Sequence, residues 1–337
     1  MTTITVIGAG VAGLTTALAL AERGAAVEVV ERGASLGLAS CSRYAGGMLA
    51  PWCERESAEP LVLSLGREAL DYWPRIMPDV VPHGTLVVAQ RRDAAELDRF
   101  GRRTSAFETL SPDEIAKIEP ALAGRFSRAL FFRDESHLDP RRAVQVLAAR
   151  LHALGVPIHL DTDGLSRRSG SDWLVDCRGL AARDVLGDLR GVKGEMLLVR
   201  CPEMQLSRPV RLLHPRIPFY VVPRGDGVFM LGATMIESSD RQTITARSLV
   251  EMLNSAYALH PAFAEAEILE IGTDARPAFP DNLPRIRVRD RTVFVNGLYR
   301  HGFLLAPALA RMAAAVILDN ASFPEVMDED HDQRRRA

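Results

Sequence analysis

The amino-acid sequence predicts an α/β protein that is interrupted by a region of antiparallel strands, and three observations lead to this fold class. The chain opens with a short apolar run, three closely spaced glycines and a helical pattern over Thr2–Gly24. Its middle, Met196–Gly272, holds short apolar runs separated by turn residues, which is typical of antiparallel hairpins. Its last quarter returns to a strand pattern at Thr292–Asn296 and a helical pattern at Phe303–Leu318. A discontinuous Rossmann-type domain with an inserted, mainly antiparallel β-sheet domain of the α+β kind accounts for all three.

The composition is that of an ordinary globular protein, with 47% hydrophobic and 25% charged residues. The formal net charge of −2 disfavours a nucleic acid or an anionic membrane surface as a partner. The four cysteines lack metal-ligand spacing, so we expect reduced thiols and no metal site. We find no basic leader segment and no run long enough to span a bilayer, and therefore expect a cytoplasmic protein.

The opening segment matches the turn that holds the pyrophosphate of an adenine dinucleotide. Gly8 permits the tight turn, Gly10 lets the backbone approach the phosphates, and Gly13 lets the following helix pack on the strand. Glu31 ends the second apolar run, where a carboxylate accepts hydrogen bonds from ribose hydroxyls and disfavours a 2′-phosphate. We also assign Val11 and Ala12, at the start of the helix, to the cofactor site.

The segment 32–51 is rich in glycine and other small residues, yet it is too apolar for a fully solvated loop. Such a backbone is suited to lie against a flat ligand. We therefore expect it to pack against the cofactor. The residues assigned there are Arg32, Cys41, Ser42, Gly46, Gly47 and Met48.

A second glycine turn, Gly297–Gly302, precedes the last helical pattern. A helix N-terminus at this place can stabilise negative charge on a flavin ring, whereas an NAD enzyme has no such need. The cofactor residues expected here are His301, Gly302, Phe303 and Leu304. The sequence thus favours FAD. We expect an FAD-binding domain at residues 1–80, 137–194 and 272–325, a substrate domain at 81–136 and 195–271, and a frayed tail at 326–337.

At these positions the sequence resembles the D-amino-acid oxidase superfamily of FAD-dependent oxidoreductases, and within it the glycine oxidases of thiamine biosynthesis. The similar segments follow one another in the same order over nearly the whole chain. They are Val6–Gly13, Ala45–Leu49, Val192–Glu195, Tyr220–Arg224, Gly232–Met235, Arg276–Pro277 and Tyr299–Pro307.

The resemblance implies roles for four further residues. Arg276 matches the arginine that binds the substrate carboxylate, a task suited to a planar guanidinium, and Arg300 matches a second arginine beside the flavin. Tyr220 matches a tyrosine that reaches the carboxylate, and Met235 matches a residue that walls a small pocket. No side chain is assigned as a general base, because hydride transfer from a neutral amine requires none. No cysteine or histidine lies in a covalent-flavin motif, so the FAD is expected to be non-covalent.

The implied reaction is the oxidation of glycine, or of a small amine such as sarcosine or D-alanine, to the imine and glyoxylate, with O2 reduced to hydrogen peroxide. In the thiamine pathway the imine, dehydroglycine, would supply thiazole synthesis. A D-amino-acid oxidase and an FAD-dependent amino-acid dehydrogenase with another acceptor remain alternatives. An NAD-dependent dehydrogenase and a non-catalytic flavin-binding protein are alternatives of other classes. The family often assembles into oligomers, and the sequence leaves a homo-oligomer open.

Three positions depart from the family pattern. Asp274 and Ala275 precede Arg276 where the family usually has Gly-Leu, and His301 stands where close relatives often have Asn. The segment 164–176 is also shorter than usual. The sequence alone assigns no role to His301.

Overall fold

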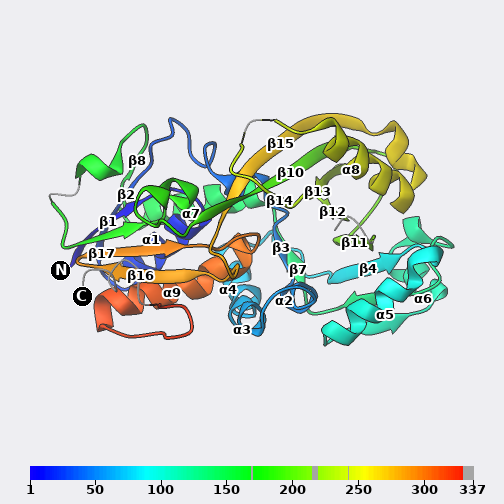
Figure 1. Cartoon of the computed structure of the whole chain (residues 1–337), viewed down its shortest axis with the longest axis horizontal. Helices are drawn as coiled ribbons and strands as arrows, with labels where there is room; N and C mark the ends of the chain where they lie inside the picture. The colour runs from blue at the N-terminus through cyan, green and yellow to red at the C-terminus, as the bar shows by residue number, and fades with distance from the viewer. Residues whose placement is uncertain (168–169, 215–218, 242, 329–337) are drawn as a thin grey trace.

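The computed structural model describes residues 1–167, 170–214, 219–241 and 243–328, and its two main β-sheets lie at opposite ends of the chain fold (Figure 1). A six-stranded sheet lies near the N-terminus and a nine-stranded sheet lies at the far end. Two long strands pass between them. This confirms the predicted fold class, a discontinuous Rossmann-type domain combined with an inserted, mainly antiparallel sheet.

The six-stranded sheet is assembled from three separate stretches of chain. Its strand order is β16-β17-β9-β1-β2-β8, and every pairing is parallel except β16 with β17. A glycine turn and helix α1 (Val11–Glu22) connect the parallel strands β1 and β2, as the opening sequence pattern predicts. The strands are β1 (Thr3–Ile7), β2 (Ala26–Val30), β8 (Ile158–His159), β9 (Trp173–Asp176), β16 (Arg285–Arg289) and β17 (Thr292–Asn296).

The nine-stranded sheet is antiparallel except where β11 pairs with β4. Its order is β14-β10-β13-β12-β11-β4-β6-β5, with β15 also paired to β10. The strands are β4 (Thr85–Ala89), β5 (Glu108–Leu110), β6 (Ala129–Phe132), β10 (Arg190–Arg200), β11 (Val210–Leu213), β12 (Phe219–Pro223), β13 (Val228–Gly232), β14 (Ile236–Glu237) and β15 (Glu267–Ala278). A separate two-stranded sheet joins β3 (Met48–Leu49) to β7 (Ser136–His137).

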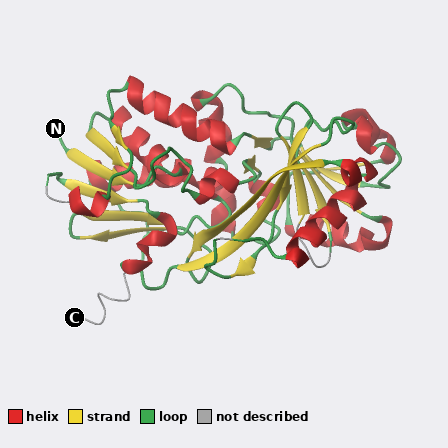
Figure 2. Ribbon diagram, turned by 90° about the horizontal axis from the view of Figure 1, so that it is seen from above, coloured by secondary structure: helices red, strands yellow, loops and turns green. Residues whose placement is uncertain are grey.

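Strands β10 and β15 connect the two ends of the molecule (Figure 2). They pair antiparallel from Arg190 opposite Ala278 to Arg200 opposite Glu267. Both strands are continuous across the boundaries that the sequence suggested near residues 194 and 272. The pairing of β10 with β15 therefore holds their residues in fixed positions between the two regions.

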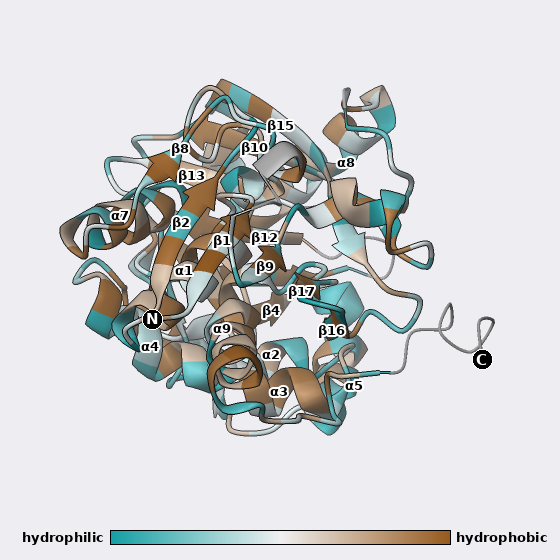
Figure 3. Cartoon of the chain, turned by 90° about the vertical axis from the view of Figure 1, so that its left-hand side faces the viewer, coloured by the Kyte–Doolittle hydropathy of each residue, from teal (hydrophilic) through white to brown (hydrophobic). Residues whose placement is uncertain are grey.

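Helix α9 (Gly302–Asp319) is the central helix of the first region and packs against α1 (Val11–Glu22) and α4 (Glu68–Ile76). It is long and apolar enough to span a bilayer, so the expectation that no run has this length is wrong. Most of this helix is buried inside the fold, however, and in Figure 3 it lies below strands β1 and β17, beside the other helices of this region. Length and composition alone do not separate a buried core helix from a membrane span.

The remaining helices cover the sheets and connect them. They are α2 (Pro51–Glu54), α3 (Pro60–Gly66), α5 (Ala94–Arg103), α6 (Pro112–Ile118), α7 (Pro140–Ala153) and α8 (Ala246–Leu259). The pattern from Leu61 to Met77 suggested one helix, but the chain forms α3 and α4 with a break at Arg67. The expectation of a frayed tail is wrong for 326–328, because Val326 is buried and Asp328 pairs with Arg287; residues 329–337 lie outside the described residues.

Candidate active site

The first glycine turn is held together by contacts that leave no room for side chains. Gly8 has φ +103°, a conformation that favours glycine. A Cβ on Gly13 would lie 1.8 Å from the carbonyl oxygen of Gly8, so helix α1 packs directly on the turn. A Cβ on Gly10 would lie 2.8 Å from Oγ of Ser40, which brings the segment 32–51 over the start of α1.

Glu31 fixes this turn through the backbone. Its carboxylate oxygens accept hydrogen bonds from the backbone N–H groups of Ala9 and Gly33, each at 2.8 Å. Each oxygen keeps a further lone pair, so the carboxylate retains capacity for a ribose hydroxyl. The predicted ribose-binding residue is thus placed at the end of β2, beside the glycine turn.

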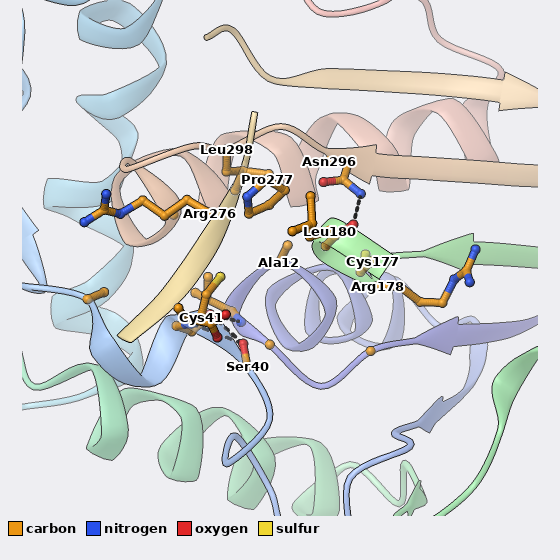
Figure 4. Close-up of a pocket in the computed structure, with 18 of the residues that line it drawn as sticks. Ala12, Ser40, Cys41, Cys177, Arg178, Leu180, Arg276, Pro277, Asn296 and Leu298 are labelled. Carbon is orange, nitrogen blue, oxygen red and sulfur yellow. Dashed lines mark hydrogen bonds between the residues drawn. The ribbon is translucent and has the colours of Figure 1, made fainter. Parts of the chain in front are cut away.

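One cavity connects the first glycine turn to the N-terminus of α9 (Figure 4). Every residue predicted to hold the cofactor lines this cavity except Gly13, which packs the helix instead. Segments that are far apart in the sequence thus meet around one space. The predicted residues that line it are Gly8, Gly10, Val11, Ala12, Glu31, Arg32, Cys41, Ser42, Gly46, Gly47, Met48, His301, Gly302, Phe303 and Leu304.

The shape and lining of this cavity suit an extended dinucleotide such as FAD. A narrow glycine cradle and a ribose-facing carboxylate lie at one end, and a helix N-terminus lies at the other. His301, which is buried there, has an Nδ1 atom without a hydrogen-bond partner among the described residues. A buried polar atom of this kind is rarely left unpaired, so a bound group would supply its hydrogen-bond partner.

Arg276 projects from β15 beside this cavity (Figure 4). A Cβ on Gly194, in the neighbouring strand β10, would lie 2.2 Å from its guanidinium carbon, so this glycine makes room for the side chain. Among the described residues the guanidinium has a single hydrogen-bond acceptor, the carbonyl of Thr234 at 3.1 Å, and no carboxylate partner. Most of its donors are therefore free for an anionic ligand.

Tyr220 lies on β12 between the antiparallel sheet and the segment 32–51. Its ring packs against Gly46 and Gly232, where a Cβ would come within 3.1 Å of the ring in each case. Burial raises the pKa of its hydroxyl, although the charge of Arg276 opposes this shift. Tyr220 therefore stays protonated at neutral pH and can donate a hydrogen bond.

A second cavity, of about 420 Å³, adjoins the first on the side of the antiparallel sheet. Tyr220, Arg300 and His301 line both cavities, whereas Met235 lines only the second and is 42% exposed. The Met235 sulfur lies 3.4 Å from Nη1 of Arg300. The structure thus brings all four residues expected at the substrate into one region.

Glu54 is the centre of a buried charge cluster that sequence reasoning missed. Its carboxylate pairs with Arg211 and lies 2.9 Å from Nη2 of Arg300 and 2.9 Å from Nε2 of His301. Burial alone would raise its pKa, but the two arginines and His301 hold the pKa of Glu54 well below its usual range. Arg300 is thus already bound by a carboxylate, unlike Arg276.

Burial also acts on the neighbouring titratable groups. It lowers the pKa of His301, against the effect of Glu54, so this imidazole is favoured in its neutral form. Burial raises the pKa of Glu135 to about 7, while its hydrogen bond from Cys53 N–H and the charge of Arg211 oppose the rise. Burial also raises the pKa of the Cys41 thiol to about 12, which makes this cavity residue unreactive as a thiolate at neutral pH.

Little in the sequence indicated that three further charged residues belong to the site. Arg211 is a single charge within the apolar strand β11, but isolated arginines are common on strand surfaces. Asp274 was conspicuous only as a departure from the family pattern, and its partner Arg241 lies in the segment between β14 and α8. Side chains so far apart in the chain are not paired by any local pattern.

Comparisons with known proteins agree with this geometry. The family model described as FAD dependent oxidoreductase (DAO) matches residues 3–316. A protein of Rhizobium etli named thiamine biosynthesis oxidoreductase ThiO is 57% identical over 96% of this chain and 98% of its own length. A protein of Pseudomonas aeruginosa named glycine oxidase is 29% identical over 92% of this chain and 93% of its own length. The crystal structure of glycine oxidase from Bacillus cereus superimposes with a TM-score of 0.81 at 24% identity, covering 99% of this chain and 98% of that one.

Proposed function

The chain belongs to the DAO family of FAD-dependent oxidoreductases, and from this premise we propose that it oxidises glycine with O2. The products are the imine, or glyoxylate after hydrolysis, and hydrogen peroxide. Sarcosine and D-alanine are the other small amines that we include as substrates. The names of the relatives from Rhizobium etli and Pseudomonas aeruginosa support this choice within the family.

The observation that carries the proposal is the position of Arg276. Its guanidinium lies over Gly194 at the edge of the cofactor cavity and has no carboxylate partner among the described residues. A planar guanidinium with free donors can bind a carboxylate through two parallel hydrogen bonds. We assign Arg276 to the substrate carboxylate, and Tyr220 to a hydrogen bond from its protonated hydroxyl to the same group.

The remaining residues position the amine and shape the space around it. Glu54 and Ser57 both contact the Arg300 guanidinium, with the Ser57 Oγ lying 2.6 Å from Nη2. These contacts fix the position of the guanidinium at the cavity lining. Met235 contacts Arg300 and lines the second cavity beside it. Bound non-covalently, FAD supplies the acceptor for the two electrons of the amine, and O2 removes them as hydrogen peroxide. We assign no side-chain base.

We further propose that the imine supplies the thiazole of thiamine in the cytoplasm. The support is the relative from Rhizobium etli, whose name refers to thiamine biosynthesis and which matches this chain over nearly its full length. An imine hydrolyses in water, so the enzyme that consumes it must receive it soon after release.

The experiment is a substrate screen with the purified protein carrying FAD. Glycine, sarcosine, D-alanine and a set of larger D-amino acids are supplied in air, and peroxide and the keto product are measured together. We expect glycine to give equal amounts of peroxide and glyoxylate. The proposal fails if glycine gives neither product.

The electron acceptor distinguishes an oxidase from a dehydrogenase of the same family. If glycine is converted only when an artificial electron acceptor is added, and no peroxide forms in air, the protein is a dehydrogenase. A preference for larger D-amino acids over glycine would instead indicate a D-amino-acid oxidase.

A further inference from the structure

Asp274 and Arg276 occupy the same face of β15. Residues two apart on a strand point to the same side, so the carboxylate of Asp274 and the guanidinium of Arg276 leave the sheet together. Asp274 lies directly opposite Gly194 of β10, and the Arg276 guanidinium lies over that same Gly194. Cβ positions of directly opposed residues are about 5 Å apart, so Asp274 is within reach of Arg276.

An aspartate at this place can compete with the substrate carboxylate for Arg276. The carboxylate that Arg276 is proposed to bind belongs to an amino acid, and Asp274 carries the same chemical group on the protein itself. Asp274 is only 4% exposed, so water does little to weaken such a contact. Yet the structure shows no ion pair between these two described residues.

The Asp274 carboxylate forms an ion pair with Arg241 instead. Its Nε pairs with Oδ1 of Asp274, and its Nη2 lies 3.0 Å from Oδ2, which makes the contact bidentate. The same Nη2 donates to the carbonyl of Ala39 at 3.1 Å, so the guanidinium is fixed from two sides. Both Arg241 and Asp274 line the cofactor cavity.

We propose that Arg241 is a positioning residue that neutralises Asp274 and thereby keeps Arg276 available for the substrate carboxylate. Bidentate pairing holds the carboxylate in one orientation, on Arg241 and not on Arg276. The departure of this chain from the Gly-Leu pattern before Arg276 is thus accompanied by a compensating arginine. The inference rests on the proposed role of Arg276.

The test compares Arg241→Ala, Asp274→Ala and the double variant as FAD-loaded enzymes. In R241A the freed Asp274 pairs with Arg276, so we expect the KM for glycine to rise about tenfold while kcat changes by less than about twofold. The dissociation constant of acetate, measured from the absorbance change of bound FAD, should rise by about the same factor. In R241A/D274A both values should return to within about threefold of wild type, and D274A alone should lie in that range.

The matched control is Arg200→Ala, which removes an arginine–carboxylate pair from the same two strands. Arg200 lies 3.2 Å from Glu267 at the exposed end of β10 and β15, and R200A should leave both constants unchanged. Arg241→Gln is a second variant that removes the charge while keeping a polar side chain, and it carries the same expectation as R241A.

Three outcomes would overturn the inference. An unchanged KM and acetate affinity in R241A and R241Q would do so, as would a loss that D274A fails to repair. The third is weaker FAD binding with normal KM in the loaded enzyme, which would make Arg241 a cofactor residue. If wild type binds acetate but does not oxidise glycine, the proposed function fails, while the acetate constants still decide whether Arg241 protects Arg276.

Discussion

The two ends of the cofactor cavity are built by different means. At the first glycine turn, the cavity wall consists of backbone and one carboxylate, Glu31, whose partners are the N–H groups of Ala9 and Gly33. At the opposite end, the cavity is bordered by buried charges, with Glu54 pairing with residues of β11 and of the turn before α9. Backbone geometry recognises a dinucleotide of fixed shape, whereas placed charges recognise a small charged substrate.

Because of this difference, the two ends of the cavity should tolerate different substitutions. The glycine turn depends on close packing, so adding one carbon atom is damaging there. The charged end depends on balance, since a buried charge left without its partner is costly. Substitutions at the two ends should therefore fail in different measurements, namely cofactor content on one side and stability or substrate affinity on the other.

Glu54→Gln should have the largest effect on stability. It leaves the partly buried Arg211 and Arg300 without the buried carboxylate of Glu54, and breaking a buried pair costs about 3–5 kcal/mol of unfolding free energy. Because the folded pKa of Glu54 lies well below 4.5, the wild-type advantage is complete above pH 4.5 and is lost as the pH falls through the folded pKa. Denaturant unfolding at several pH values measures both, and an equal stability of the two proteins at pH 7 would contradict the prediction.

Arg276→Ala should abolish most glycine turnover without affecting the cofactor. Loss of the bidentate partner of a carboxylate corresponds to a fall of about 10²–10³-fold in kcat/KM. FAD content should equal that of wild type, because the glycine turn and its contacts with Glu31 are unchanged. Steady-state kinetics and the FAD-to-protein ratio give the two values. Normal turnover, or a loss of FAD in parallel with activity, would be the opposite result.

Gly13→Ala should damage the cofactor end. The new Cβ would lie 1.8 Å from the Gly8 carbonyl oxygen, and relieving such overpacking costs about 1–3 kcal/mol. We expect a lower melting temperature and weaker FAD binding. Gly187→Ala is the control away from the cavity, since its Cβ would have no atom within 4 Å. Equal FAD affinity in the two variants would contradict the packing role of Gly13.

Glu135→Gln should give the smallest effect and one that depends on pH. The folded pKa of Glu135 is raised to about 7, so its folded form holds a proton that the unfolded chain releases near 4.5. Wild-type stability should therefore decline relative to E135Q as the pH rises from about 4.5 to about 7, and the difference should then level off. Parallel stability profiles across this range would show that Glu135 does not titrate as the structure implies.

The residues predicted for the cofactor end lie around one cavity because the determinants of that end are local. Gly8, Gly10 and Glu31 lie in one strand–turn–helix–strand unit, and their spacing carries the geometry. The charged end depends on pairs such as Glu54 with Arg211, which lie 157 residues apart, and no local pattern joins them. Arg276 was identified only through the resemblance to a family. The break at Arg67 between α3 and α4 was missed because the apolar pattern continues across it.

The most direct test of the proposed function is to add glycine to the FAD-loaded protein without oxygen. We expect the yellow absorbance of bound FAD to be lost on addition of glycine and to return on admission of air, with one peroxide formed per FAD. R276A, at the same glycine concentration, should stay yellow. A wild-type protein that binds FAD but remains oxidised with excess glycine would show that it is not a glycine oxidase.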